Sequence, residues 1–417
     1  MNEQRDKHGT ARIVVRDSTR RAVTRMTMTT NHTSHHTDVA IIGAGILGLA
    51  HAYAFAKRGL RVTVFERSGT PVGASIRNFG MVLVTGQPPG AMHALAQASR
   101  KIWLDWASGA ALHVRRSGSL MFARSEAEAQ LMEAFAATRA EAAGYDAAML
   151  SRAALDDLYD GRFRKHRAAL HGRADLQVYS REAVPALIDY LRREFNVDFR
   201  FGTLVQDVDD GRVETTAGQW RAEHVVVCAG HDYLSLLAPQ LAVLEPRVCR
   251  LQMLRVRPTT PFTLDHAVLT GLSCLHYGAF SDLPEAAALQ AEVAAREPAV
   301  LEHGIHLLAS PTPEGDLIVG DSHDYGDDPS PFNAQAIDEI LLGLAEDTLG
   351  TTLRVVERWQ GVYGARTGTS GAPFSILRAA PNVTGVYMHS GVGMSVGPAL
   401  GECIVSHLLD GAALPVA

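Results

Sequence analysis

Residues 38–67 constrain the fold more than any other part of the chain. They read DVAIIGAGILGLAHAYAFAKRGLRVTVFER: an apolar run precedes a glycine-rich turn, an Ala- and Leu-rich run follows it, and a second β-branched run ends at Glu66. This order predicts a buried strand, a turn, a helix and a second buried strand. Such a βαβ unit indicates a parallel sheet covered by helices, which is the α/β class.

The turn GAGILG has the GxGxxG spacing of dinucleotide-binding proteins. In that motif Gly43 permits a tight turn, Gly45 lets the backbone approach a pyrophosphate, and Gly48 lets the helix pack against the sheet. The helix N-terminus then offers free N–H groups and the positive end of its dipole to the phosphates. Glu66 lies 18 residues after Gly48, where a carboxylate can accept hydrogen bonds from ribose hydroxyls. The alternative is a glycine turn with a purely structural role.

Two later segments favour FAD over NAD. GASIRNFGMV, at residues 73–82, is a polar loop framed by glycines. We interpret it as passing over the flavin ring, with Ser75, Arg77 and Asn78 offering donors to the flavin or to an anionic group of the substrate. MHSGVGMSVGPALGECIV, at residues 388–405, places a second glycine turn before a helix. A second helix N-terminus can therefore stabilise the negative charge of a reduced flavin.

The remaining sequence indicates two domains. Helices are expected at residues 91–109, 126–144, 181–196 and 333–349, whereas residues 244–324 are strand-like with loops. A parallel-sheet domain built from separated pieces, with an inserted antiparallel sheet, accounts for this order. We expect a dispensable, disordered extension at residues 1–37, an FAD-binding domain from residues 38–90, 170–240 and 355–417, and a substrate domain from residues 91–169 and 241–354.

Composition excludes several classes of protein. The formal net charge of −6 does not favour nucleic acid or an anionic membrane as a partner. The four cysteines form no CxxC pair, so we expect neither a disulfide framework nor a zinc site. Because such cysteines suit a reducing compartment, we expect a cytoplasmic location. No apolar run closely follows the pair Arg20–Arg21, so we do not expect twin-arginine export. The HGIH stretch at His303 lacks the spacing and acidic partner of a helical metal motif, and we expect no metal.

These motifs resemble the FAD-dependent D-amino-acid oxidase superfamily, which includes glycine and sarcosine oxidases. The resemblance spans residue 38 to the C-terminus and rests on IIGAGILGLAHAYAFAKRG, Glu66, VVVCAG and GVYMHSGVGMSVGPA. GASIRNFGMV with QPPG also resembles a branch associated with phosphonate degradation. The resemblance implies a p-hydroxybenzoate-hydroxylase-like fold. It also implies hydride transfer to the flavin from the carbon next to an amine, which gives an imine that hydrolyses to an aldehyde or ketone.

One position departs from the family. In relatives that use carboxylates, the W-x-G-x segment, here residues 359–362, is followed by an arginine that clamps the substrate's carboxylate, whereas here the next residue is Tyr363. Arg366 and Arg77 are the nearest alternative clamps, and a larger headgroup such as a phosphonate would want a different arrangement of donors. The expected catalytic residues are Arg77, Asn78, Tyr363 and Arg366. The expected FAD contacts are Gly43, Ala44, Gly45, Ile46, Leu47, Gly48, Glu66, Arg67, Ser75, Asn78, Phe79, Gly80, Val205, Ala229, Gly230, Gly391, Val392, Gly393, Met394 and Ser395.

Other side chains allow two interpretations. His276 and Tyr277 either line the substrate cavity or form a buried pair, His389 lies near the flavin or in the core, and Arg250 binds substrate or a structural acid. Cys228 is expected to be a small buried apolar residue.

The functional hypothesis is FAD-dependent oxidative deamination of an aminophosphonate, such as 2-aminoethylphosphonate or an N-methyl or hydroxylated relative, with O₂ or another electron acceptor. The alternatives are a glycine, sarcosine or D-amino-acid type of oxidase, a flavoprotein monooxygenase acting on an aromatic, and an FAD-binding protein without catalysis.

Overall fold

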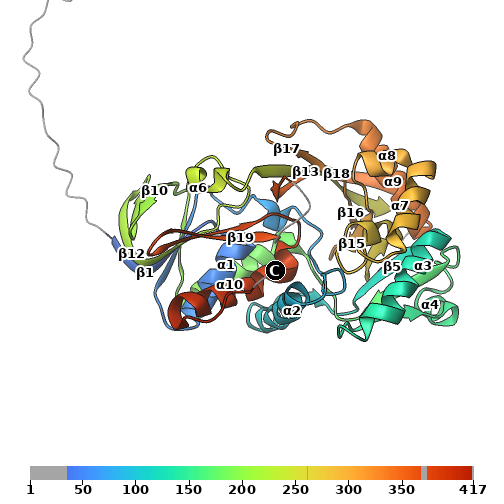
Figure 1. Cartoon of the computed structure of the whole chain (residues 1–417), viewed down its shortest axis with the longest axis horizontal. Helices are drawn as coiled ribbons and strands as arrows, with labels where there is room; N and C mark the ends of the chain where they lie inside the picture. Colours follow the sequence, from blue (N-terminus) through green and yellow to red (C-terminus); the bar gives the residue numbers. More distant parts are fainter. Residues whose placement is uncertain (1–34, 261, 368–372, 416–417) are drawn as a thin grey trace, which may run out of the picture. The chain divides into compact units, whose positions relative to one another are not determined.

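The computed structural model describes residues 35–260, 262–367 and 373–415 (Figure 1). Most of the predicted N-terminal extension, including Arg20 and Arg21, therefore lies outside the described residues. The first strand, β1 (His35–Ile42), begins three residues before the predicted boundary. None of the helices in the described ranges is long and apolar enough to cross a membrane.

The first sheet has the predicted parallel core. Strand β1 pairs in parallel with β2 (Val62–Glu66) on one side and with β12 (Gly218–Val227) on the other. The parallel order continues outward to β9 (Asp198–Phe201) and β20 (Val383–Met388). Three antiparallel strands extend it, namely β10 (Val205–Asp209), β11 (Arg212–Thr215) and β19 (Phe374–Ala380).

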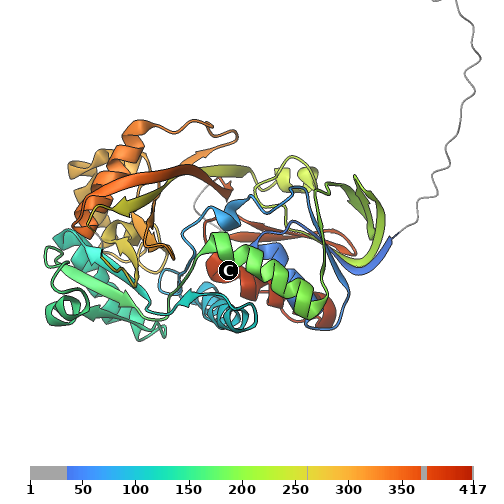
Figure 2. The same ribbon diagram turned by 180° about the vertical axis from the view of Figure 1, so that it is seen from behind.

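Four helices share one apolar core with this sheet: α1 (Ile46–Ala56), α2 (Ala91–Gly109), α5 (Ser180–Phe195) and α10 (Gly393–Asp410). Figures 1 and 2 show α1, α2 and α10 close together, and a Cβ at Gly401 of α10 would lie 2.8 Å from the Cβ of Ala50 in α1. Helix α2 was predicted to belong to the substrate domain. Instead, its Trp103 Nε1 donates to the carbonyl of Met394 at 2.9 Å, because its apolar face packs on α10.

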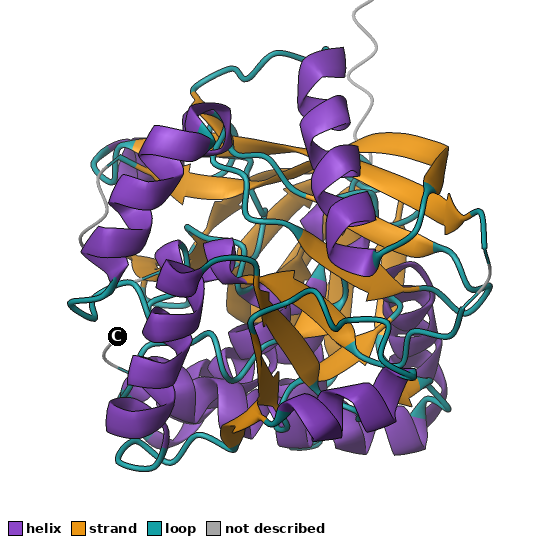
Figure 3. Ribbon diagram, turned by 90° about the vertical axis from the view of Figure 1, so that its right-hand side faces the viewer, coloured by secondary structure: helices purple, strands orange, loops and turns teal. Residues whose placement is uncertain are grey.

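The second sheet is largely antiparallel and has its own core. Its strands in order are β17 (Asp324–Gly326), β13 (Pro246–Pro258), β16 (Leu317–Gly320), β15 (Leu308–Pro311), β14 (Ala267–Thr270), β5 (Ser119–Ala123), β7 (Ala168–Gly172) and β6 (Ala147–Leu150), with β18 (Leu353–Arg366) paired to β13. Its helices are α3 (Glu126–Phe135), α4 (Arg152–Tyr159), α7 (Ala286–Arg296), α8 (Pro298–Glu302) and α9 (Gln335–Leu349). Figure 3 shows helices on the outer sides of the strands.

Three sequence predictions differ from this sheet. The strand-like assignment of residues 244–324 missed α7 and α8, whose Ala-, Leu-, Glu- and Arg-rich sequence has high helix propensity. The α-helix predicted to reach residue 144 ends at Phe135, and a wider π-helical segment, η2 (Ala136–Ala140), follows it. Residues 355–366 were assigned to the FAD-binding domain, but they lie in β18, which pairs with β13 along its whole length.

Short elements connect the two sheets. A three-stranded sheet joins β3 (Met81–Val82), β8 (Leu176–Val178) and β4 (Val114–Arg115). The segments η1 (Ala74–Ile76), α6 (Ala238–Ala242) and η3 (Gly271–Leu275) complete the chain. The architecture is an α/β fold in which a parallel, helix-covered sheet and a largely antiparallel sheet face a common space.

Candidate functional site

The glycine turn after β1 has no room for a Cβ at two of its positions, Gly43 and Gly48. Gly43 has φ +102°, and a Cβ there would lie 2.3 Å from the carbonyl oxygen of Cys228. A Cβ at Gly48 would lie 1.8 Å from the carbonyl oxygen of Gly43. No side chain caps the N-terminus of α1 through its N-cap residue, Gly45. The N–H of Ile46 donates to the Ser75 hydroxyl, and the two N–H groups that follow it can serve an anionic ligand such as a pyrophosphate.

Glu66 lies at the end of β2 beside this turn. One carboxylate oxygen accepts the N–H of Ala44 at 3.0 Å and the other accepts the N–H of Ser68 at 2.9 Å. Each oxygen retains a further lone pair, and the side chain lines the cavity described below. The carboxylate is thus held in place and can still accept hydrogen bonds from a ribose. Its neighbour Arg67 pairs with Asp232 at 2.8 Å.

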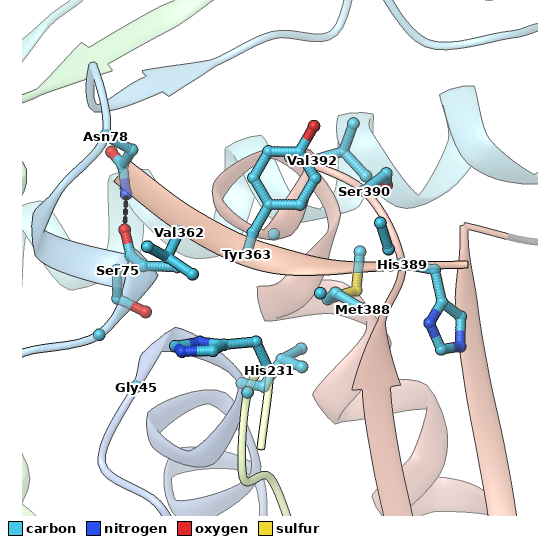
Figure 4. Close-up of a pocket in the computed structure, with 18 of the residues that line it drawn as sticks. Gly45, Ser75, Asn78, His231, Val362, Tyr363, Met388, His389, Ser390 and Val392 are labelled. Carbon is cyan, nitrogen blue, oxygen red and sulfur yellow. Dashed lines mark hydrogen bonds between the residues drawn. The ribbon is translucent and has the colours of Figure 1, made fainter. Parts of the chain in front are cut away.

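The loop at residues 73–80 is fastened to α1 and closed by its own side chains. The Ser75 hydroxyl accepts the N–H of Ile46 at 2.8 Å. The Asn78 amide donates to the Ala74 carbonyl at 2.9 Å and accepts the Gly80 N–H at 2.7 Å, which folds the loop on itself (Figure 4). Asn78 therefore uses both its oxygen and its amide nitrogen within the loop, although it was predicted to be catalytic.

Arg77 connects this loop to the second sheet. Its carbonyl accepts the indole N–H of Trp359 at 3.0 Å, and its guanidinium lies 3.4 Å from the carbonyl of Gln360. The side chain also lines the cavity. Arg77 is therefore placed where the loop, β18 and the cavity meet.

The C-terminal glycine turn supplies a second helix N-terminus. Gly391, Val392, Gly393 and Met394 all line the cavity, and α10 begins at Gly393 with no side-chain cap on its first N–H groups. Ser395 is different, because its hydroxyl accepts the buried N–H of Leu83 at 2.9 Å. Of the predicted FAD contacts, all in described segments, Ala44, Gly48, Gly80 and Ser395 do not line the cavity, and the other sixteen do.

The cavity has a volume of about 1160 Å³, which exceeds the roughly 300–1,000 Å³ of typical small-molecule sites. It begins at the glycine turn and Glu66, passes the loop at residues 73–80, and ends among side chains of the second sheet. One continuous space thus joins a dinucleotide cradle to a second chamber. The glycines that admit no Cβ, the free N–H groups at two helix N-termini and the fixed carboxylate fit a flavin dinucleotide.

The chamber at the second sheet is lined by tyrosines and histidines. Tyr363 lies on β18 with its hydroxyl 3.4 Å from that of Tyr325, and burial raises the pKa of Tyr363 well above its usual value. His276 and Tyr277 both line the cavity, which agrees with the first of the two interpretations given for them. Burial also raises the pKa of Asp321 to about 6.

The remaining predicted side chains lie in several places. Arg366 lines the cavity, and its buried Nε has no hydrogen-bond partner in the described ranges. His389 lies near it: burial and, secondarily, the Arg366 guanidinium lower the pKa of His389 to about 4. Arg250 is structural, because it donates to the carbonyls of Ser330 and Phe332 and pairs with Asp324. Cys228 is buried, as expected.

Sequence reasoning missed several polar side chains that line the cavity, among them His231, His306, Asp321 and His323. His231 directly follows the predicted cofactor contact Gly230 in the CAGHD stretch, which could have identified it. Its imidazole projects below Tyr363 in Figure 4, and burial, with Arg67 and Arg77 nearby, lowers its pKa. His306 comes from a different segment than Asp321 and His323, so no local spacing indicated the group.

Comparisons with known proteins match this geometry. The family model described as "FAD dependent oxidoreductase" (DAO) matches residues 38–407. Glycine oxidase from Geobacillus kaustophilus superimposes with a TM-score of 0.71 and 20% identity over 92% of this chain and 97% of its own. L-proline dehydrogenase from P. horikoshii gives a TM-score of 0.72 and 16% identity over 92% and 96%. At these identities the likeness is one of fold.

A curated relative matches only in part. One of the subunits of opine oxidase from Rhizobium meliloti is 34% identical over 102 residues, which are 22% of this chain and 28% of that protein. The aligned part thus spans less than a third of the relative's length.

Proposed function

The chain belongs to the DAO family of FAD-dependent oxidoreductases, and from this premise we propose that it oxidises a small amine that carries an anionic group, in the manner of an amino-acid oxidase. FAD is its cofactor, as in the rest of the family. The DAO match and the glycine oxidase and L-proline dehydrogenase folds support the amine as the reacting group.

The observation that carries the proposal is the single cavity shared by the two sheets. The turn at Gly43, Glu66 and the start of α10 line it from the first sheet and its helices, whereas Tyr363, Tyr325 and His323 line it from the second sheet. The two sets meet at Gly391, where a Cβ would lie 3.6 Å from Cε1 of Tyr363. A substrate in the chamber would therefore lie next to a cofactor held by the parallel sheet. When bound, FAD supplies the acceptor for the hydride of the carbon next to nitrogen, and the resulting imine hydrolyses to a carbonyl compound and an amine or ammonia.

The protein's own residues would bind, orient and desolvate the amine. Only three described carboxylates line the cavity, namely Glu66, Asp232 and Asp321, and no lysine does. Glu66 and Asp232 are engaged at the cofactor end. A strong protein base is not needed if the amine enters uncharged. The buried chamber favours that form, because an ammonium without a partner is costly to desolvate.

The anionic group can be a carboxylate or a phosphonate. The amino-acid neighbours favour a carboxylate, so an amino acid is the first candidate. Tyr363 favours the second candidate, an aminophosphonate, because it replaces the arginine that the family resemblance would place there to clamp a carboxylate. Arg77 and Arg366 line the same cavity, and we propose that one of them binds the substrate's anionic group.

A panel of amines tests the proposal. The FAD-loaded protein is mixed without oxygen with glycine, sarcosine, D-alanine and L-proline, with 2-aminoethylphosphonate and its N-methyl derivative, and with uncharged amines of matched size. Loss of the oxidised flavin absorbance reports turnover. We expect anionic amines to reduce the flavin fastest. Reduction by NADPH alone, with none by any amine, would instead support a monooxygenase.

A further inference from the structure

Three histidines and one aspartate converge at the far end of the cavity, outside the cofactor cradle. His276 follows η3, His306 precedes β15, and Asp321 and His323 lie between β16 and β17. One ligand atom from each histidine lies within 4.8 Å of those of the other two. The ring centroids are 3.9 Å apart for His276 and His306, and 5.0 Å apart for His306 and His323.

The hydrogen bonds of these side chains leave their metal-binding atoms free. His323 Nδ1 lies 2.8 Å from the carbonyl of Gly304. A carbonyl only accepts, so this nitrogen carries the hydrogen and Nε2 keeps a lone pair. His306 Nδ1 lies 3.3 Å from the Ser273 hydroxyl, and its Nε2 is buried without a partner among the described residues. A second nitrogen fixed by a carbonyl or hydroxyl is the usual support of a metal-binding imidazole.

Asp321 indicates that a ligand bound by this cluster would be a cation. Its Oδ1 lies 3.6 Å from His306 Nε2, its Oδ2 lies 3.9 Å from His323 Nε2, and Oδ1 is buried without a hydrogen bond from the described part of the chain. Both separations are too long for a hydrogen bond. An anion would be repelled by the carboxylate, whereas a cation would be attracted by all four side chains. A buried carboxylate beside two nitrogen lone pairs is costly unless a cation lies between them.

We propose that His276, His306, His323 and Asp321 bind a divalent transition metal ion of the zinc class. Imidazole and carboxylate ligands suit Zn²⁺, Co²⁺, Ni²⁺ or Fe²⁺ better than Ca²⁺ or Mg²⁺, which prefer oxygen ligands. In a tetrahedral site with bonds of about 2.1 Å, ligand atoms are about 3.4 Å apart. The separations of 3.6 and 3.9 Å need to close only slightly. His276, which is stacked on His306 and has no side-chain hydrogen bond within the described segments, must tilt to complete the set.

The site borders the substrate chamber. The His323 ring lies 6.3 Å from that of Tyr363, and His276 is exposed to the cavity. If the proposed amine oxidation holds, the metal would expand from four to five ligands and bind an oxygen of the substrate's anionic group. This role rests on the proposed function, whereas metal binding itself does not.

The metal site is tested on the full-length, FAD-loaded protein. Metal is measured by mass spectrometry after purification with Zn²⁺, and the chelator-treated protein is then titrated with Co²⁺, whose tetrahedral absorption lies at longer wavelength than that of the flavin. The variants are His306→Asn and His323→Asn, in which the amide retains a donor near Nδ1 but has no counterpart of Nε2. His266→Gln is the matched control, since this buried histidine pairs with Tyr159 away from the cluster.

We expect about one metal ion per chain in the unaltered protein and in the control. Each Asn variant should bind Co²⁺ on the order of 100-fold more weakly while its FAD content is preserved. Circular dichroism and FAD content identify a variant that has not folded. In that case the Co²⁺ titration of the unaltered protein shows whether the metal site exists. Absence of both Zn²⁺ and a Co²⁺ spectrum in the unaltered protein, or equal metal in folded variants and control, would overturn the site.

The role in substrate binding has a separate measurement. Metal removal should raise KM at least about 10-fold for an anionic amine and leave KM for an uncharged amine unchanged. Equal changes for both amines would overturn this role while the metal site stands. If no amine reduces the flavin in either form, the proposed function fails, and the metal content still decides the site.

Discussion

The Ser75 hydroxyl accepts a 2.8 Å hydrogen bond from the backbone N–H of Ile46, so the polar loop is attached to the first turn of α1. Gly45 makes room for this contact, since a Cβ there would lie 3.1 Å from the hydroxyl oxygen. The hydroxyl hydrogen stays free to donate to a phosphate. The loop proposed to approach the flavin and the turn proposed to bind the pyrophosphate are therefore positioned together.

Ser75→Ala should weaken FAD binding. The change removes a hydrogen bond worth about 0.5–1.5 kcal/mol, which corresponds to a rise of about 2- to 13-fold in the Kd of FAD. Flavin fluorescence during titration of the apoprotein measures it. Ser151→Ala is the control, because the Ser151 hydroxyl accepts the Ala154 N–H at the start of α4. An equal rise in Kd in both variants would mean that the effect is one of general stability.

Glu66→Ala should have a larger effect on the same Kd. It removes the proposed acceptor of the ribose hydroxyls and the two hydrogen bonds to Ala44 and Ser68. A hydrogen bond to a charged group is worth roughly 1.5–3 kcal/mol, so the Kd of FAD should rise by about 10- to 150-fold. Glu66→Gln, which keeps one oxygen, should lie between. Unchanged FAD retention in the Ala variant would place the ribose elsewhere.

The sequence predicted the parallel sheet and its glycine turn because their constraints are local. The turn has no room for a Cβ at Gly43 or Gly48, and the register of β1 with β2 follows from two uninterrupted buried strands. The assignment of α2 failed for a different reason. An amphipathic helix shows that it has an apolar face, but the sequence does not show that Trp103 packs on α10 rather than on the second sheet.

Arg77→Ala should lower kcat/KM more for an anionic amine than for an uncharged one. If the guanidinium grips the anion, its loss costs about 1.5–3 kcal/mol, or about 10- to 150-fold, with FAD content preserved. Arg366→Ala is the matched comparison. Arg366 lines the same cavity and is the other proposed clamp. Equal losses on both amines in both variants would mean that these arginines serve the flavin or the fold.

The free energy of unfolding should decrease as the pH falls below about 6.5, partly because of His51. This histidine is fully buried, and burial lowers its pKa from 6.5 to about 4. The unfolded chain therefore binds the proton more readily between these values, so stability is lost as pH falls through 6.5, by about 2 kcal/mol at pH 5. Melting temperatures near pH 7.5 and pH 5 should differ less in His51→Gln than in the unaltered protein. An equal difference in His51→Gln and in the exposed control His113→Gln would contradict this.

The substrate end could not be predicted in the same way. His276, His306 and His323 are brought together only by the pairing of β14, β15 and β16. The sequence search considered HGIH as a local motif and expected no metal, because a helix spacing was the signal sought. Asp321 gave no signal at all, since a single aspartate after a strand is common. Clusters that depend on tertiary pairing have no local spacing to reveal them.

An anaerobic titration with the best amine of the panel tests the central claim most directly. Flavin reduction is followed by absorbance, and the carbonyl product and the released amine or ammonia are quantified in the same sample. The account predicts one carbonyl and one amine or ammonia for each flavin reduced, because each turnover removes one hydride, with its two electrons, from the carbon next to nitrogen, and water then hydrolyses the C=N bond that forms. Flavin that no amine in the panel reduces, or that is reduced without release of a carbonyl product, would contradict it.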